Sequence, residues 1–287
     1  MTNFSIFLTA ILIYFKICIC LEILDISTKL KLCRSRFDKM SFWLAVTIGN
    51  SRWHWGLFAN DKLLETKAHQ HLTGTGDRDR SIDSICESQS LSILPVCLIS
   101  VVPQQTKLWL NYQNLQQLTL DDIPLRNIYP TMGIDRAMAV WGAGETYNYP
   151  CLVIDGGTAL TFTGVNENKE LVGGAILPGL RSQLVSLHQK TSALPQVILP
   201  ECLPTRWALN TNEAIASGII YTVIAGIQSF IKDWYEKFPQ SAIILTGGDA
   251  DLLLKYLQIY SFHLNKSLMV DRNLIFWGIK SLYHTNS

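Results

Sequence analysis

The sequence predicts an α/β protein in which one domain is duplicated and a cleft separates the two copies. Two stretches, beginning near Phe42 and Leu152, each have the pattern of a three-stranded meander followed by helical segments. The strand that opens each stretch ends in a similar polar turn, at 47–51 in the first and at 155–158 in the second. Each α/β copy can bury its own core, and clefts between domains commonly bind ligands.

The composition excludes some classes of partner. The 287 residues include 24 basic and 23 acidic side chains without a long run of one sign, so neither nucleic acid nor an anionic membrane is expected as a partner. A small neutral or anionic substrate fits better. The seven cysteines form no Cys-x-x-Cys pair, which indicates reduced thiols in a cytosolic protein. We expect four of them in or near the core: Cys86, Cys97, Cys151 and Cys202.

The first 39 residues differ from the rest of the chain. Residues 4–20 are strongly apolar, and five basic residues follow between Lys29 and Lys39. The apolar part is slightly short for a membrane-spanning helix and lacks the cleavage site of a secretory signal. We expect an extension outside the fold, with a membrane anchor or a targeting peptide as the alternatives. The globular pattern begins directly after Met40.

The first copy, residues 40–147, opens with apolar and alternating segments separated by Asn, Asp and Gly turns. A polar loop at 74–80 precedes a short helix, and a loop with Pro and Gly at 129–136 leads into a helix rich in small residues. The expected strands are 42–48, 52–58, 62–67, 93–102 and 123–128, and the expected helices are 81–90 and 137–145.

The second copy, residues 148–287, repeats the meander and continues with helices. Asn210 and Glu213 have the spacing of a helix cap, and Ile215 and Ile219 share one face of the helix that follows. Gly218 inside this helix indicates close packing against another backbone. The expected strands are 152–155, 159–165, 170–172 and 242–245, and the expected helices are 178–190, a long one capped by Asn210, and 250–257.

The turn Asp155-Gly156-Gly157-Thr158 is the first candidate site. Its glycines leave backbone N–H groups open to a phosphate, and Asp155 can hold a cation against that phosphate. An ordinary Asp-Gly-Gly turn is the alternative. The turn at 246–249 is either a further anion site or a helix start capped by its Asp. His69 and His71 lie in a polar stretch and are expected to be solvated rather than metal ligands.

Seven motifs occur in order between residues 44 and 282. They are Ile48-Gly49-Asn50-Ser51, Ser100-Val101-Val102-Pro103, Gly133-Ile134-Asp135-Arg136, Asp155-Gly156-Gly157-Thr158, the Gly-rich stretch 173–179, Thr211 with residues 213–218, and Thr246-Gly247-Gly248-Asp249. This ordered set resembles the type III pantothenate kinases, a branch of the superfamily of acetate and sugar kinases, heat-shock ATPases and actin. The resemblance implies two RNase H-like, actin-like ATPase domains, at 40–147 and 148–287.

The resemblance also implies an activity. It implies a cytosolic homodimer that uses ATP to phosphorylate pantothenate at its primary hydroxyl, the first step toward coenzyme A, with a divalent metal such as magnesium and with potassium or ammonium. Asp135 is implied as the general base and Asp155 as the metal ligand. The other implied roles are substrate binding by Gly133, Arg136 and Thr211, the last from the dimer partner, and ATP phosphate binding by Gly49, Asn50, Ser51, Gly156, Gly157 and Thr158.

Phosphoryl transfer needs these residue types, because the protein mainly positions the reactants and neutralises charge. The charge of Arg136 beside Asp135 is expected to keep that carboxylate ionised and able to act as a base. A plain Asp–Arg pair on the surface is the alternative. The sequence contains neither a Walker-type loop nor a Gly-x-Gly-x-x-Gly turn after a strand.

One position departs from the family pattern. Thr47 stands where the first loop commonly begins with Asp, and a hydroxyl does not attract a divalent metal as a carboxylate does. We therefore expect an active kinase with an unusual metal requirement, in which Asp155 carries more of the cation binding. The alternatives are a non-catalytic relative that binds a nucleotide or pantothenate, and another kinase or phosphatase of the superfamily.

Overall fold

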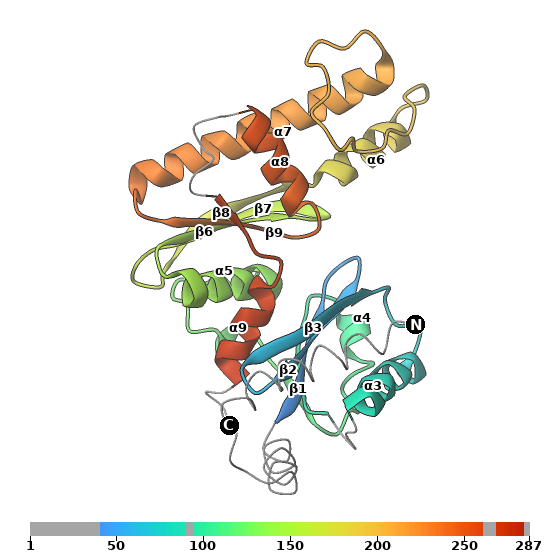
Figure 1. Ribbon diagram of the computed structural model, residues 1–287, viewed down its shortest axis with the longest axis vertical. Helices are drawn as coiled ribbons and strands as arrows, with labels where there is room; N and C mark the ends of the chain where they lie inside the picture. Colours follow the sequence, from blue (N-terminus) through green and yellow to red (C-terminus); the bar gives the residue numbers. More distant parts are fainter. Residues whose placement is uncertain (1–40, 90–93, 261–267, 284–287) are drawn as a thin grey trace, which may run out of the picture. The chain divides into compact units, whose positions relative to one another are not determined.

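Two five-stranded sheets with the same arrangement form the framework of the protein (Figure 1). The computed structural model describes residues 41–89, 94–260 and 268–283, so the expected extension at 1–39 lies outside the described residues. The strand orders are β3-β2-β1-β4-β5 and β10-β9-β6-β7-β8. The first sheet contains β1 (Phe42–Ile48), β2 (Trp53–Ala59), β3 (Lys62–His69), β4 (Val96–Ser100) and β5 (Leu115–Gln117). The second contains β6 (Cys151–Gly156), β7 (Ala159–Val165), β8 (Leu171–Pro178), β9 (Ala242–Thr246) and β10 (Leu268–Val270).

The two sheets confirm the predicted duplication. In each, the first strand lies at the centre, with a meander on one side and parallel strands on the other. β1 pairs with β4, and β6 with β9, in parallel, while β2 with β3, and β7 with β8, pair antiparallel. The helices are α3 (Thr75–Gln89), α4 (Pro103–Thr106), α5 (Ile134–Tyr147), α6 (Leu180–Lys190), α7 (Thr211–Lys237), α8 (Ala250–Tyr260) and α9 (Leu274–Tyr283), with a 3-10 turn at Leu120–Asp122.

The two faces of the second sheet contribute to different cores, because alternate side chains of β6 point to opposite faces. Cys151 and Val153 of β6 belong to the core that contains α5 and α9. Leu152 and Ile154, the residues between and after them, belong to the core that contains α6, α7 and α8. Successive side chains of a strand point to opposite faces, so α5 and α7 cover opposite faces of this sheet, as Figure 1 shows.

Helix α5 connects the two sheets. It packs along α9 and also contacts β4 of the first sheet and β6 and β7 of the second. The α5–α9 crossing is close, because a Cβ at Gly142 would overlap the carbonyl oxygen of Leu274, and a Cβ at Gly278 would meet Met138.

Helix α7 is long and apolar enough to cross a membrane by length and composition. Half of its most apolar window is buried inside the protein. Ile220, Ile224, Ile227 and Ile231 are fully buried in the core of the second sheet, so the apolar composition of α7 is explained by this core. Asn210 caps it as predicted, accepting a hydrogen bond from the backbone N–H of Glu213 at 3.0 Å.

Several local predictions are wrong. Helix α3 begins at Thr75 inside the expected polar loop, because Asp77 in its first turn accepts hydrogen bonds from the backbone N–H and hydroxyl of Thr73. The expected strand at 123–128 is irregular and keeps only an isolated bridge between Arg126 and Glu170, since Asn127 has φ of 63°.

Two further corrections concern single residues. Gly218 has no atom within 4 Å of the position that a Cβ would take, so the expected close packing of another backbone against it is wrong. Cys86, Cys97 and Cys151 are buried as expected, but Cys202 is exposed.

Candidate functional site

Three turns meet at Asp155, at the end of the central strand of the second sheet. Asp155 pairs in register with Thr246 of β9. Gly247 follows with φ of +86°, and a Cβ there would overlap the Asp155 carboxylate. A Cβ at Gly179, ahead of α6, would likewise overlap the carbonyl oxygen of Gly157. Glycine is therefore required where these turns approach one another.

The Asp155 carboxylate makes no hydrogen bond or ion pair with another described residue. Its pKa is raised to about 6, mainly by burial and in addition by the charge of Asp135, while Arg136 opposes the shift. A bound cation would relieve this unfavourable burial. No cluster of three or more His, Cys, Asp or Glu side chains able to hold a metal occurs in the described part of the chain, so a metal here would take its remaining ligands from phosphate and water.

The first predicted phosphate loop, Gly49–Ser51, contacts the second, Gly156–Thr158. The hydroxyl oxygens of Ser51 and Thr158 lie 2.8 Å apart. The Gly49 N–H donates to the carbonyl oxygen of Arg52 at 3.0 Å and closes a tight turn after β1. Thr47 is buried, with 8% of its surface exposed, so the end of β1 offers a hydroxyl where β6 offers a carboxylate.

Asp135 and Arg136 lie in the first turn of α5 rather than in the expected loop. Asp135 Oδ1 accepts a hydrogen bond from the backbone N–H of Arg136 at 2.8 Å. The guanidinium of Arg136 turns toward other groups: it donates to Thr163 Oγ1 at 3.2 Å, the Tyr129 hydroxyl at 2.9 Å and the Phe162 carbonyl at 3.1 Å. No ion pair joins the two side chains among the described residues, so the plain Asp–Arg surface pair, the alternative for these residues, is not formed.

Thr211 is the first residue of α7 and is exposed. Helix α7 covers the face of the second sheet opposite α5, so Thr211 and the Asp135 turn belong to different faces of this sheet. No hydrogen bond in the described structure joins Thr211 to Gly133, Asp135 or Arg136.

Three polar contacts in the described structure were not predicted from the sequence. Arg181, in the first turn of α6, donates to the buried Asp249 carboxylate at 3.0 Å. His71 Nε2 lies 2.9 Å from the carbonyl oxygen of Gly49, although the sequence predicts a solvated side chain. His69 is also engaged, as the acceptor of a hydrogen bond from Trp55 Nε1 at 3.0 Å. Gln70 lies between the two histidines, and no sequence pattern distinguishes these contacts from solvation.

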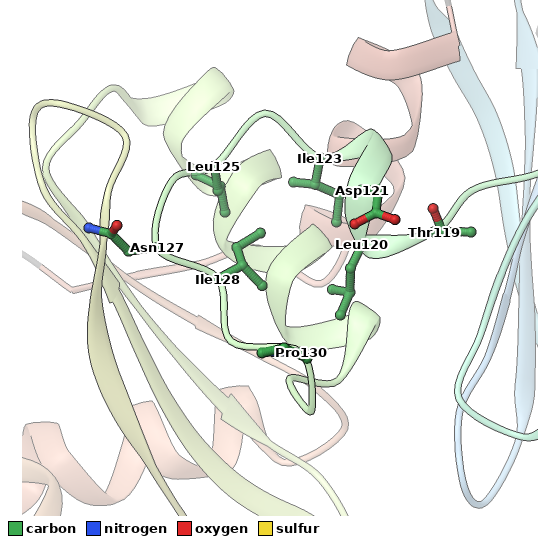
Figure 2. Close-up of a pocket in the computed structure, with 8 residues that line it drawn as sticks. All are labelled: Thr119, Leu120, Asp121, Ile123, Leu125, Asn127, Ile128 and Pro130. Carbon is green, nitrogen blue, oxygen red and sulfur yellow. The ribbon is translucent and has the colours of Figure 1, made fainter.

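A cavity of about 670 Å³ lies on the chain segment ahead of Gly133 (Figure 2). The aliphatic side chains of Leu120, Ile123 and Ile128 line it together with polar groups of Thr119 and Asp121. Its lining includes none of the predicted site residues.

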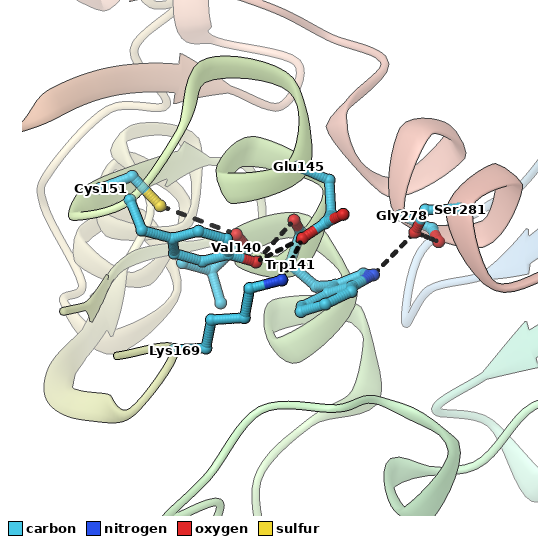
Figure 3. A network of polar contacts seen from close by, with 8 residues as sticks. Val140, Trp141, Glu145, Cys151, Lys169, Gly278 and Ser281 are labelled. Carbon is cyan, nitrogen blue, oxygen red and sulfur yellow. Dashed lines mark hydrogen bonds and ion pairs between the residues drawn. The ribbon is translucent and has the colours of Figure 1, made fainter. Parts of the chain in front are cut away.

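A polar network fixes the C-terminal half of α5 (Figure 3). Lys169, in the turn between β7 and β8, pairs with Glu145 at 2.9 Å and lies 4.6 Å from the ring centre of Trp141. Trp141 Nε1 donates to the hydroxyl of Ser281 in α9 at 2.7 Å. The helix that carries Asp135 is thus anchored to both the second sheet and α9.

Comparisons with known proteins place this geometry in context. A family model described as type III pantothenate kinase matches residues 43–233. A type III pantothenate kinase of Nostoc sp. is 48% identical over 258 residues, which cover 84% of this chain and 94% of the relative. The corresponding enzyme of Synechocystis sp. is 44% identical over 249 residues, with 86% and 92% covered.

Solved structures support the fold alone, because their identity is low. A Campylobacter jejuni protein described as a Baf family transcriptional activator superposes with a TM-score of 0.57 at 22% identity, covering 85% of this chain and 98% of that one. The activator of 2-hydroxyisocaproyl-CoA dehydratase from Clostridium difficile, solved with bound ADPNP, gives a TM-score of 0.50 at 8% identity, with 85% and 97% covered.

Proposed function

The chain belongs to the type III pantothenate kinase family, and from that premise we propose how its residues carry out the ATP-dependent phosphorylation of pantothenate. The observation that carries the assignment is the half-buried Asp155 carboxylate, which has no described partner and lies among three glycine-containing turns. Such a site suits a cation and the phosphates of a nucleotide. The relatives named above give no support to a non-catalytic binder.

Asp135 is the proposed general base. As the pantothenate hydroxyl oxygen forms its bond to the γ-phosphorus, the bond from that phosphorus to the β-phosphate oxygen breaks, and ADP leaves. Asp135 accepts the hydroxyl proton. Gly133, where a Cβ would crowd the Asp135 carboxylate, and Arg136 provide the proposed substrate contacts. The hydrogen bonds of Arg136 to β7 fix its orientation before substrate arrives.

The two phosphate loops are proposed to position ATP. Gly49, Asn50 and Ser51 approach from the first sheet, and Gly156, Gly157 and Thr158 from the second, with the Ser51–Thr158 contact at their meeting point. Asp155 would hold a divalent metal, which supplies neutralisation of phosphate charge when bound. Potassium or ammonium and a cytosolic location are proposed from the family resemblance.

The variant Asp135→Asn tests the proposed general base. Asp135→Asn keeps the size of the side chain but cannot accept a proton, so turnover should fall about 10²- to 10⁴-fold. ADP release coupled to a dye, with pantothenate, magnesium and potassium present, measures it, and the unfolding midpoint should match wild type. Near-normal turnover of this variant would show that Asp135 is not the general base. Absence of pantothenate-dependent ADP release from the wild-type protein would contradict the activity itself.

The second prediction concerns the proposed homodimer, in which Thr211 reaches the partner's substrate. Large apolar side chains are exposed in the segment that connects α6 to Thr211, including Trp207 at 86% and Ile198 at 84%, and a second copy would cover them. If Thr211 acts across the interface, mixing and re-associating Asp135→Asn and Thr211→Ala proteins should restore activity. About one quarter of wild-type activity is expected, because half of randomly formed symmetric dimers contain one intact site.

Light scattering during size-exclusion chromatography tests the dimer separately from the chemistry. A dimer whose mixed variants stay inactive would place Thr211 in the site of its own chain or outside the reaction. A monomeric but active enzyme would contradict the dimer and leave the kinase assignment intact.

A further inference from the structure

The first phosphate loop is held by a histidine. His71 Nε2 lies 2.9 Å from the carbonyl oxygen of Gly49. A carbonyl oxygen only accepts hydrogen bonds, so Nε2 carries the proton and donates it. His71 follows β3 and is partly buried, where a hydrogen bond competes less with water than it would on an open surface.

The segment that carries His71 is itself clamped. The backbone N–H of Leu72 donates to Gln105 Oε1 at 2.9 Å, and Gln105 Nε2 donates to the carbonyl oxygen of Leu72 at 3.1 Å. Gln105 belongs to α4, which follows β4. In the same connection, the N–H of Val101 donates to the carbonyl oxygen of Ile48 at 3.0 Å. Two successive carbonyl groups at the end of β1 are thus fixed by two other parts of the first domain.

The hydrogen bond to the Gly49 oxygen also fixes the direction of the Asn50 N–H. In a trans peptide the C=O and the following N–H point in opposite directions. Because His71 holds the oxygen of Gly49, the N–H of Asn50 points away from His71. Neither this N–H nor that of Ser51 donates to another described residue. Adjacent free N–H groups form a concavity that binds anions.

We propose that His71 is a positioning residue of the kinase: it holds the Gly49–Asn50 peptide in the orientation that presents the Asn50 N–H to the terminal phosphates of ATP. The inference rests on the proposed function, in which Gly49–Ser51 line the phosphate path. The bond acts on the nucleotide side of the reaction, so losing it should weaken ATP binding and leave pantothenate binding unchanged.

Substitutions at His71 separate this role from a structural one. His71→Phe keeps a planar ring and removes the donor, whereas His71→Gln keeps an N–H at a similar reach. His71→Phe should raise the KM for ATP about 5- to 10-fold, the effect of one hydrogen bond of ordinary strength. The KM for pantothenate should change less than about twofold, and His71→Gln should restore most of the loss.

His188 offers a matched control. Its Nδ1 lies 2.9 Å from the carbonyl oxygen of Leu194 in another part of the chain, so His188→Phe removes the same type of contact away from the phosphate loop. We expect no change in either KM for this variant. Gln105→Ala should raise the KM for ATP as His71→Phe does, and the double variant should show less than the product of the two effects, because both act through one contact.

Other results would overturn the inference. If His71→Phe lowers the unfolding midpoint but leaves the KM for ATP unchanged, His71 is structural. The same holds if His71→Gln does not bring the KM for ATP back toward that of wild type. Ser51→Ala tests the phosphate-binding role of the loop separately from the role of His71. If Ser51→Ala raises the KM for ATP and His71→Phe does not, the loop assignment stands and the role of His71 is wrong. If neither variant changes it, the loop assignment is wrong as well.

Discussion

At the scale of single residues, the end of β6 carries a charge that the folded protein does not satisfy by itself. Asp155 is half-buried near the charge of Asp135, and Arg136, whose charge opposes the pKa shift of Asp155, directs its guanidinium to β7. Leaving a buried carboxylate without a partner costs free energy. The cost indicates a position kept for a ligand rather than for stability, as is common at functional sites.

This cost predicts a pH-dependent stability. The pKa of Asp155 is about 6 in the folded protein, against 3.8 as its ordinary value. A raised pKa means that the folded state binds a proton more tightly than the unfolded state, so this group makes wild type less stable as the pH rises from about 4 to about 6. Asp155→Asn lacks the charge and should be more stable than wild type at about pH 8, by up to about 3 kcal/mol, with turnover abolished.

Urea unfolding without divalent metal, at about pH 4 and about pH 8, measures the difference. The difference in stability should fall to well under about 1 kcal/mol at the lower pH, where Asp155 is protonated in the folded state and partly protonated in the unfolded state. Added magnesium should stabilise wild type at the higher pH and leave the variant unchanged. A variant that is equally destabilised at both pH values would show that Asp155 is a structural residue.

The local setting of a residue could be predicted better than its contacts. The turn chemistry of Asp155 and the apolar strands around it are visible in the sequence. The partners of Arg136 are not, because Thr163 and Phe162 lie on a strand that the chain reaches almost thirty residues later. His71 was missed for the same reason, since its acceptor is a backbone oxygen 22 residues away.

At the scale of elements, the helix α5 is held by a close crossing with α9. A Cβ at Gly142 would overlap the carbonyl oxygen of Leu274, which is backbone and cannot rotate away. Because Asp135 lies in the first turn of the same helix, any shift of α5 moves the proposed base. A displacement of about 1 Å is enough to reduce catalysis strongly.

Gly142→Ala should therefore destabilise the protein by about 2 kcal/mol or more and lower turnover. Gly218→Ala in α7 is the matched control, since it makes the same substitution inside a helix with no atom within 4 Å. This control should gain about 0.5–1 kcal/mol, because Ala favours helix over Gly. Thermal unfolding and the ADP-release assay compare the two variants. Equal changes in stability and turnover for the two variants would mean that the α5–α9 crossing tolerates a methyl group.

Elements with strong periodicity were predictable and elements fixed by distant contacts were not. The meanders and the capped helix α7 follow from alternation and the Asn210–Glu213 spacing. The strand expected at 123–128 fails, because Asn127 has a left-handed backbone. Residues 171–178 form one long strand, although the expected strand ends at 172, because pairing with β7 continues through Gly173 and Gly174.

At the scale of the whole molecule, the duplication places two equivalent strand ends together with different chemistry. β1 and β6 occupy the same central position in their sheets. Near its end, however, β1 carries Thr47, whereas β6 carries Asp155. The contact between Ser51 and Thr158 joins the loops that follow them. The pair is therefore asymmetric in charge, and we propose that the second copy binds the cation. The boundary between residues 147 and 148 stays a prediction, since α5 packs on both sheets and on α9.

A variant that begins at Met40 tests how much of the chain the fold needs. The first buried run, Trp43–Ile48, belongs to the central strand of the first sheet, and the family match begins at residue 43. We propose that this variant is soluble and matches full-length protein in unfolding midpoint and kcat/KM, because no part of the described cores is removed. A second variant that begins at Gly49 lacks β1 and should not fold, since β1 lies between β2 and β4 and its removal exposes both. An insoluble or inactive Met40 variant beside an active full-length protein would show that residues 1–39 contribute to the folded enzyme.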